Sequence, residues 1–526
     1  MSEADSAWHM LNGGHEGRDG PAVTSSSWRI LGRMGQCGRL RGGLWAIAIT
    51  LGIGLAASCG GSSGNGPGAG QASSSGGASS SGDTSSSGTS SSGTSSSGTS
   101  SGGTSSGDTS SSGTSGGPVG DGSAGTCLGA DVLSAMGKSK LLVGLSTGDD
   151  AVADAAPFDI RYEYISGGLF DASSVCASCA SGCTANGKTC ANSGGGCAWW
   201  GCYQDDTKKP GLYVRDFIAT ATNPTPPQIT MYTYYELLQV LQAKLGPNAT
   251  VEGKLEVSQG ATDTGIMTRY FADWRFLLQQ IGSASAILHI EPDFWGYANQ
   301  AGADPTQLKA AVASVNPTDC GSLPNTIAGM GQCMIAMVRK YAPHAFVGLQ
   351  ASAWMTGPDV AANTDPTLDV AAEARKAATF LAACGESSAD LIVVETSDRD
   401  AGYDQSQGDK TAFWDVTNKT LPDFHQDFAW VKALTEALGK PALFWQMPLG
   451  NANQNNTNSH WKDNRVDYFF AHEDELAAAH VLGAAYGAGA GGQTIPGLAG
   501  DPAGDGGNLI AKTKAYAAAG GQAFCP

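Results

Sequence analysis

The sequence is poor in positive charge. It has 30 Lys and Arg residues against 48 Asp and Glu residues, a formal net charge of −18 at pH 7. The phosphates of a nucleic acid would be repelled by such a chain, which argues against nucleic-acid binding. The sequence also lacks a long apolar run. The segment from Leu44 to Ala57 has about 14 residues, fewer than the ~20 that span a bilayer as a helix.

Several catalytic motifs are absent as well. There is no Gly-x-Ser-x-Gly elbow, no His-Glu-x-x-His helix, no Walker loop and no dinucleotide fingerprint. The six histidines that follow Cys59 have no paired spacing suited to a metal ion. We therefore expect neither a cofactor nor a metal ion.

The first 59 residues carry export features. Arg39 and Arg41 precede the apolar run, which ends in Ala56-Ala57-Ser58-Cys59 and resembles a bacterial lipoprotein signal. Such signals prefer Leu three residues before the cysteine, whereas Leu55 lies four before it. The resemblance implies that residues 1–59 are a presequence and that Cys59 is lipidated and anchors the protein to the bacterial cell envelope. The alternative is an ordinary signal peptide, which would release an extracellular protein.

Residues 60–125 consist almost entirely of Ser, Gly and Thr. A segment of this composition has no apolar surface to offset the loss of chain entropy, so we predict a disordered linker. The remaining residues, 126–526, are enough for one large α/β domain.

Eleven cysteines follow Cys59, and six of them fall within one short segment. In an exported chain this density predicts disulfides, and the lack of histidine among them disfavours zinc. The six are Cys176, Cys179, Cys183, Cys190, Cys197 and Cys202. Cys127 and Cys525 flank the domain and are predicted to tie its ends together, and Cys384 is predicted to stay free.

Apolar, β-branched runs alternate with helical patterns, which predicts a single (β/α)8 TIM-type barrel. The predicted strands are 141–145, 158–164, 228–234, the stretch from Ala286 into Glu291, 345–350, 391–395, 442–446 and 481–486. Predicted helices include 264–281, 370–383 and 428–438. The cysteine-rich insertion, residues 171–206, follows the second strand.

Barrels of this type place the active site at the carboxyl ends of their strands. Glu291 and Asp293 follow the fourth strand, and Glu395 ends the sixth. Burying a carboxylate there is costly unless it is used. The other strand-end acids, which helix capping explains better, are Asp149, Asp150 and Glu236.

Paired carboxylates at a barrel mouth suit glycosidic cleavage, in which one acid protonates the leaving oxygen and the other activates water or attacks. We predict Glu291 as acid or base, Glu395 as its partner and Asp293 as a modulator or alternate acid. The predicted substrate-binding residues are Trp295, Trp354, Trp445, Gln446, Tyr234, His289, Asp398 and Trp461. For Trp445 and His289, packing in the core is an equally good interpretation.

The segment Ile290-Glu291-Pro292-Asp293 is similar to a segment of family six glycoside hydrolases, the cellulase group. The resemblance implies that Asp293 lies in an active site, and it favours hydrolysis of a glycan, for which a β-glucan is one candidate. The acid of that family lies upstream, whereas the related residues 397–400 of this chain lie downstream. Barrel glycosidases with an acid on strand four carry a nucleophilic Glu on strand seven, where this chain has Gln446.

The sequence thus predicts a monomeric, surface-anchored glycoside hydrolase acting on a polysaccharide. The alternative is a non-catalytic, glycan-binding lipoprotein on the same barrel, because a fold alone does not establish catalysis. Carboxylates converging in a pocket would favour the enzyme. Carboxylates bridged to Arg161 or Arg399 would favour the binding protein. A lyase or transferase on the same scaffold remains a third option.

Overall fold

The computed structural model describes residues 127–166, 168–170, 184–185, 188–189, 199, 211–224, 226–246, 249–487 and 493–524. The predicted signal, the Cys59 lipidation site, the linker and the six clustered cysteines lie outside the described residues. Within the described ranges, no helix is long and apolar enough to cross a membrane.

Eight parallel strands close into a barrel, in the order β1-β10-β9-β8-β7-β6-β5-β2. They are β1 (Leu142–Ser146), β2 (Ile160–Ile165), β5 (Ile229–Tyr234), β6 (Ala286–Ile290), β7 (Phe346–Ser352), β8 (Ile392–Glu395), β9 (Ala442–Met447) and β10 (Val481–Tyr486). The predicted (β/α)8 barrel is confirmed, and the bounds of the predicted strands agree to within two residues. Nearly all strand residues are buried, because a parallel sheet has helices outside and side chains inside.

Helices occupy the crossovers between strands, and others precede β1 and follow β10. They are α2 (Ala130–Ala135), α3 (Asp150–Ala153), α4 (Leu212–Ala221), α5 (Leu237–Leu245), α6 (Thr264–Ile281), α7 (Phe294–Ala301), α8 (Pro317–Cys320), α9 (Ile327–Tyr341), α10 (Val370–Ala383), α11 (Ala401–Ser406), α12 (Phe424–Leu438), α13 (Arg465–Phe469), α14 (Glu473–Ala478) and α15 (Asn508–Ala518). Two predicted helices, 264–281 and 370–383, have the predicted bounds. The third begins at Phe424 rather than Phe428, because the Asp423 carboxylate caps it by accepting from the Gln426 N–H at 2.8 Å.

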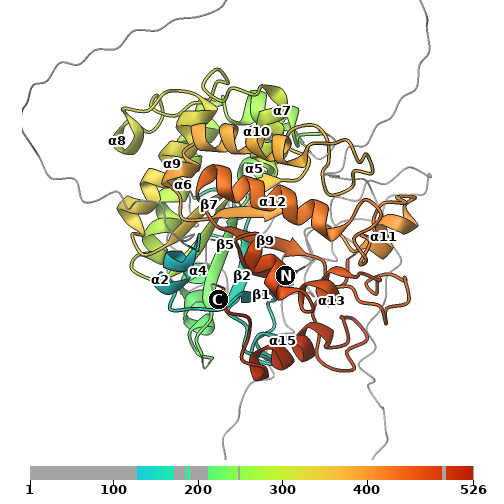
Figure 1. The fold of residues 1–526 in the computed structure, drawn as a ribbon. Coiled ribbons are helices and arrows are strands. Elements are labelled where there is room, and N and C mark those ends of the chain that lie inside the picture. Colours follow the sequence, from blue (N-terminus) through green and yellow to red (C-terminus); the bar gives the residue numbers. More distant parts are fainter. Residues whose placement is uncertain are drawn as a thin grey trace, which may run out of the picture. The chain divides into compact units, whose positions relative to one another are not determined.

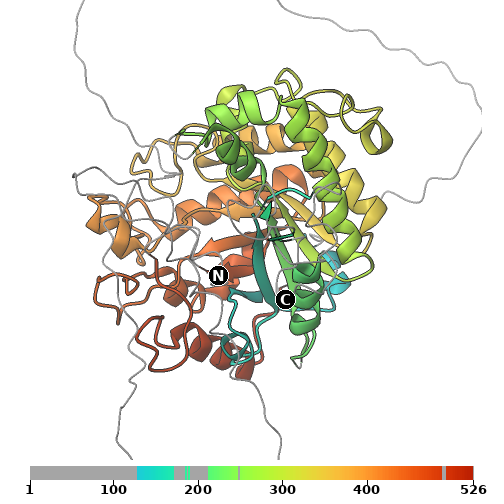
Figure 2. The ribbon, with the colours of Figure 1, turned by 180° about the vertical axis from the view of Figure 1, so that it is seen from behind.

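The longer helices pack in pairs around the barrel. Helices α10 and α12 pack against each other on one side (Figure 1). Helices α4, α6 and α9 cover strands on another side, drawn green to yellow in Figure 2. The apolar stripe of α6 buries Tyr270, Trp274 and Leu277 completely. Each such side chain contributes about 1.5–3 kcal/mol of hydrophobic stabilisation.

Short elements and disulfides complete the fold. A π-helical turn, η2 (Glu256–Gly260), precedes α6, a 3-10 turn, η3 (Glu386–Ser388), precedes β8, and β3 (Thr184–Ala185) pairs with β4 (Lys188–Thr189) after β2. Cys320 and Cys333 form a disulfide. Cys127 is also disulfide-bonded, while its predicted partner Cys525 lies outside the described residues. Cys384 is free and buried, as predicted.

Candidate active site

Polar side chains from several strands gather at the carboxyl end of the barrel. Glu395 is the last residue of β8, and Asp293 comes three residues after β6 ends. Strand β7 contributes Gln350 and Ser352, and β9 contributes Gln446. These residues are far apart in the sequence but meet in space, because parallel strands of a barrel end at the same mouth.

Asp293 and Glu395 form a carboxyl pair. Their side chains share a hydrogen bond, which requires a proton on one of them. The Gln350 amide donates to Oδ1 of Asp293 at 3.2 Å and to Oε2 of Glu395 at 3.1 Å. The Ser352 hydroxyl donates to the same Glu395 oxygen at 3.3 Å. Donors from β7 therefore hold together two acids that come from β6 and β8.

Burial shifts the titration of both acids upward. It raises the pKa of Asp293 to about 7, with the Asp398 carboxylate adding to the rise and the bond to Glu395 opposing it. Burial and the charges of Asp293 and Asp398 raise the pKa of Glu395 well above its ordinary range. We therefore assign the shared proton to Glu395 and the negative charge to Asp293 near neutral pH.

An aromatic cluster in the barrel adjoins this pair. The Trp445 ring centroid lies 4.5 Å from that of His289 and 5.8 Å from that of Tyr164. The Tyr164 hydroxyl donates to Oε1 of Gln446. Trp445 and His289 are buried, so the structure places them in the core, which is the alternative that the sequence left open. Gln446 is held by Tyr164 next to the mouth.

Three residues that end strands at the mouth have left-handed backbones. The φ angles are 45° at Glu291, 65° at Asp293 and 61° at Gln446. Such conformations cost a non-glycine residue about 1–3 kcal/mol and are concentrated at functional sites. At Gln446 the strain accompanies an irregular register between β9 and β10. The fold thus maintains strain at the positions where it presents polar side chains.

The structure places Glu291, the acid that the sequence favoured, away from the carboxyl pair. Its side chain is fully buried, and Oε1 accepts from the backbone N–H groups of Glu236 at 3.2 Å and Leu237 at 3.1 Å. These N–H groups begin α5, where a helix leaves its backbone donors without partners of its own. Burial raises the pKa of Glu291 to about 8. Its position suits an anchor for α5.

Two aromatic residues predicted to bind substrate are core residues instead. The Trp295 indole N–H donates to the Ile290 carbonyl at 2.8 Å, and the ring is fully buried. The Tyr234 hydroxyl donates to Oδ2 of Asp273 on α6 at 2.8 Å, and that side chain is also fully buried. Tyr234 points outward from its strand because the helix covering it supplies an acceptor.

Trp354 and Asp398, both predicted to bind substrate, lie at the mouth. Both line a small pocket of about 60 Å³ that also includes Glu395 and Arg465. The Trp354 ring is mostly buried, and its indole N–H has no acceptor in the described part of the chain. Trp461 is half-buried in the loop after β9 and packs edge-on against Tyr403, with ring centroids 5.3 Å apart.

The remaining strand-end acids have structural roles. Asp149 caps α3 by accepting from the Ala151 N–H at 2.8 Å, as predicted. Asp150 pairs with Arg161 at 2.8 Å, and Arg399 pairs with Asp398 at 3.5 Å. The side chain of Glu236 accepts from the Gly168 N–H at 3.0 Å, so the expectation that it caps a helix is wrong. Glu291 takes that place at α5.

Sequence reasoning missed several residues of the mouth. Gln350 ends a predicted strand, so the rule for strand-end residues could have found it. Tyr164 and Ser352 also end strands, but hydroxyl groups are too common there to be a signal. Glu252 lies in a turn between α5 and η2, where no pattern in the sequence marks it.

Loops around the mouth are tied together by Asp400. Its carboxylate accepts from the Gly450 N–H at 2.6 Å and from the Thr494 N–H at 2.8 Å. This bond pattern connects the loops that follow β8, β9 and β10. Asp400 belongs to residues 397–400, the segment compared above with the acid motif of family six. Its carboxylate is hydrogen-bonded to backbone N–H groups. Across the described ranges, no group of three His, Cys, Asp or Glu residues could hold a metal ion.

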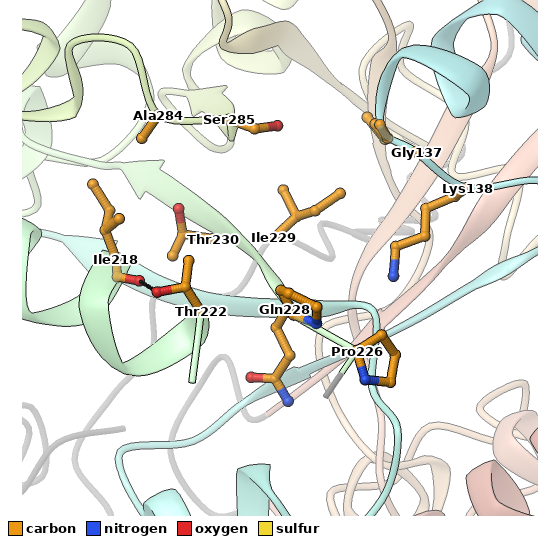
Figure 3. A pocket seen from close by; sticks show the side chains of 12 residues that line it. Gly137, Lys138, Ile218, Thr222, Pro226, Gln228, Ile229, Thr230, Ala284 and Ser285 are labelled. Atoms are coloured by element: carbon orange, nitrogen blue, oxygen red, sulfur yellow. Dashed lines mark hydrogen bonds between the residues drawn. The ribbon is translucent and has the colours of Figure 1, made fainter. Parts of the chain in front are cut away.

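A larger cavity, of about 390 Å³, lies at the opposite end of the barrel (Figure 3). It is lined by Gln228 to Thr230, where β5 begins, and by Ala284 and Ser285, which precede β6. Its one charged side chain, Lys138, is paired with Asp159 at 2.6 Å. The cavity thus offers space without an acidic side chain, whereas the mouth has the paired acids.

Comparisons with known proteins find structural likeness only. No protein-family model and no curated protein matches the chain, so the resemblance to family six stays confined to residues 290–293. A Bacteroidetes-affiliated GH5 cellulase is 11% identical, with a TM-score of 0.37 over 71% of this chain and 90% of that chain. Endo-glycoceramidase II from Rhodococcus sp. is 10% identical, with a TM-score of 0.37 over 72% of this chain and 80% of that chain.

A third structure similar to this chain has a different chemistry. The carboxyl transferase domain of Rhizobium etli pyruvate carboxylase is 13% identical, with a TM-score of 0.31 over 76% of this chain and 51% of that chain. At identities and TM-scores this low, none of the three indicates a reaction for this chain. Function is therefore argued from the mouth of the barrel.

Proposed function

We propose that the chain is a glycoside hydrolase whose reaction takes place at the Asp293–Glu395 pair. The observation that carries the proposal is a hydrogen-bonded pair of acids, the buried Glu395 and the half-buried Asp293, at the carboxyl end of the barrel. Hydrolysis of a glycosidic bond needs carboxyl groups that exchange protons near neutral pH. A pKa of about 7 at Asp293 suits a group that alternates between its two protonation states.

The pair acts as one unit in this proposal. In retaining glycosidases the acid and the nucleophile are about 5–5.5 Å apart, and in inverting ones about 6.5–9.5 Å. Two carboxyl groups that share a hydrogen bond are closer together than in either class of glycosidase. Asp293 therefore supplies the negative charge that faces the anomeric carbon or its attacking water, and Glu395 tunes and orients Asp293 through the shared proton.

Aromatic side chains next to the pair suit a sugar. The rings of Trp354 and Tyr297 lie with centroids 4.7 Å apart, and Trp354 lines the same pocket as Glu395. The pocket is much smaller than the roughly 300–1,000 Å³ of a small-molecule site, so a glycan would lie across the mouth. Export and anchoring through Cys59 belong to the same proposal, and they rest on the sequence alone.

The test compares two matched Asp→Asn variants of the full chain, produced with its disulfides formed. Each protein is incubated with a panel of polysaccharides, and released oligosaccharides are identified by mass spectrometry. We expect Asp293→Asn to lower kcat/KM at least about a hundredfold, because it removes the carboxylate. Asn tolerates a positive φ, so the backbone conformation is kept.

The control is Asp273→Asn. Asp273 is also a buried acid with a pKa raised to about 7, but it lies on α6 and accepts from Tyr234. We expect this variant to keep its activity. Polysaccharide bound without any product from the unaltered protein would contradict the proposal and favour the glycan-binding alternative. Equal activity of Asp293→Asn and the unaltered protein would remove Asp293 from the mechanism.

A further inference from the structure

A third carboxyl group lies beside the Asp293–Glu395 pair. Glu252 is half-buried in the turn that follows α5, and its charge interacts with those of Asp293 and Asp398. Asp293 is bonded to Gln350 and Glu395, whereas the Glu252 carboxyl has no hydrogen-bond partner in the part of the chain that the structure describes. Glu252 can thus donate a proton to a substrate atom without losing a hydrogen bond, while Asp293 keeps its bonds to Gln350 and Glu395.

The backbone around Glu252 is fixed against the helix that Asp293 begins. Gly253 has a φ of 79°, and a Cβ there would lie 3.1 Å from the Tyr297 ring. Tyr297 is on the first turn of α7, and its N–H donates to the Asp293 carbonyl at 3.0 Å. The close approach of the turn to Tyr297 therefore requires glycine, and it brings Glu252 to the side of Asp293.

The segment after Glu252 has an unusual conformation. It continues into η2, a π-helical turn that packs against α5 and α7. Such turns are rare and recur at functional sites. Glu256 in this turn is fully buried, and neither of its carboxyl oxygens has a partner in the described ranges. Burial raises the pKa of Glu256 far above its ordinary range, so it stays protonated and neutral.

We propose that Glu252, beside the Asp293–Glu395 pair, is the general acid that protonates the glycosidic oxygen. This inference rests on the proposed function. It supplies the general acid, a role that two carboxyl groups bonded directly to each other leave open. Its burial and the negative charges nearby hold Glu252 protonated, raising its pKa to about 8, while Arg399 opposes the rise. The other titratable groups that interact with Glu252 are Tyr235, Glu256 and Tyr297.

The step balances without any further reagent. The Glu252 carboxyl gives its proton to the glycosidic oxygen as the bond from that oxygen to the anomeric carbon breaks, and the bonding electrons stay on the oxygen. The leaving sugar departs as an alcohol, and water adds to the anomeric carbon. The proton that this water loses goes to the Asp293 carboxylate and returns to Glu252 through solvent, so one water is consumed for each bond cleaved.

The test uses two substrates that differ in their need for acid. One is the oligosaccharide released in the polysaccharide panel, and the other is a dinitrophenyl glycoside of the same sugar, whose leaving group departs without protonation. We expect Glu252→Gln in the full chain to lower kcat/KM for the oligosaccharide at least about a hundredfold. For the dinitrophenyl glycoside, kcat/KM should fall less than about tenfold. The pH profile for the oligosaccharide should also lose its fall on the alkaline side.

Glu256→Gln is the matched control. It makes the same substitution four residues away, at an acid that is already neutral. It should leave kcat/KM for both substrates unchanged. Asp293→Asn should lower kcat/KM for both substrates alike. This pattern separates the role of Asp293 from that of Glu252, whose loss affects mainly the oligosaccharide. An equal loss on both substrates for Glu252→Gln, or no loss on either, would overturn this inference while leaving the proposed function standing. Absence of any hydrolysis by the unaltered protein would instead remove the proposed function.

Discussion

At the scale of single residues, Asp293 meets two demands at once. Its backbone, with a positive φ of 65°, lies between the end of β6 and the start of α7. Its carboxyl is held by Gln350 and Glu395. Strain of about 1–3 kcal/mol persists there because two further strands fix the side chain. A residue used only as a turn would have no reason to keep a half-buried carboxyl group that is bonded to another acid.

Glu291 offers a test of whether a buried acid is used as an anchor. Its pKa is raised from 4.5 to about 8, so the folded state holds a proton that the unfolded chain has lost at intermediate pH. The stability that this proton provides is fully present below pH 4.5 and is lost as pH rises toward 8. In Glu291→Gln the free energy of unfolding should fall less steeply with pH, by up to about 1.4 kcal/mol per pH unit between pH 4.5 and 8.

Urea unfolding at pH 5, 6, 7 and 8 measures this difference. The glutamine carbonyl can still accept from the N–H groups of Glu236 and Leu237, so α5 stays anchored. Glu291→Ala removes the acceptor and should cost about 1–3 kcal/mol at every pH. Parallel stability curves for Glu291→Gln and the unaltered chain would show that Glu291 does not titrate in this range.

The sequence was enough to place Asp293 and Glu395 at the mouth, because both lie at the ends of apolar strands that must meet in a barrel. It could not rank them against Glu291. Whether a strand-end side chain faces the mouth depends on the backbone angle at that residue, and Glu291 has a φ of 45°. Glu252 was missed for another reason: its place beside Asp293 depends on a contact between Gly253 and Tyr297.

At the scale of elements, β7 aligns the amide that joins the two acids. Gly348 lies two residues before Gln350, and a Cβ at Gly348 would be 2.2 Å from the Leu391 carbonyl oxygen. That atom belongs to backbone, so it cannot move aside as a flexible side chain would. The spacing of β7 from the start of β8 therefore depends on glycine at this position.

Gly348→Ala should therefore disturb both stability and activity. We expect a loss of about 1–3 kcal/mol in the free energy of unfolding, the usual cost of overpacking. Activity should fall further than the folded fraction, because Gln350 shifts relative to Glu395. Gly265→Ala, at an exposed position near the start of α6, is the control and should be neutral or slightly stabilising. Unchanged stability of Gly348→Ala in urea unfolding would contradict the packing argument.

Strands and long helices were predictable because burial imposes their patterns. A strand that is covered on both faces reads as a continuous apolar run, and α6 repeats its apolar residues at helical spacing. Helix α12 was predicted to start four residues late, since its first turn depends on the Asp423 cap rather than on an apolar stripe. Short turns such as η2 have no such pattern.

At the scale of the whole molecule, the buried acids predict an unusual dependence of stability on pH. Burial raises the pKa of several acids to about 7 or 8, and each loses its stabilising proton as pH rises. They are Glu252, Asp273, Glu291, Asp293 and Asp400. Acids with lowered pKa act in the opposite sense, because their contribution is lost as pH falls below about 4. They are Asp263, Asp304, Asp319, Asp365 and Asp415.

We therefore expect the unfolding free energy to be highest near pH 4–5 and to fall steadily up to pH 8. The net charge of −18 adds repulsion in the same direction, and salt separates the two causes. In 1 M salt the repulsion between exposed charges is screened, while the titration of buried acids persists. A melting temperature that is flat or rising from pH 5 to 8 in high salt would mean that these acids ionise in the folded protein without cost. The carboxyl pair at the mouth would then share no proton near neutral pH.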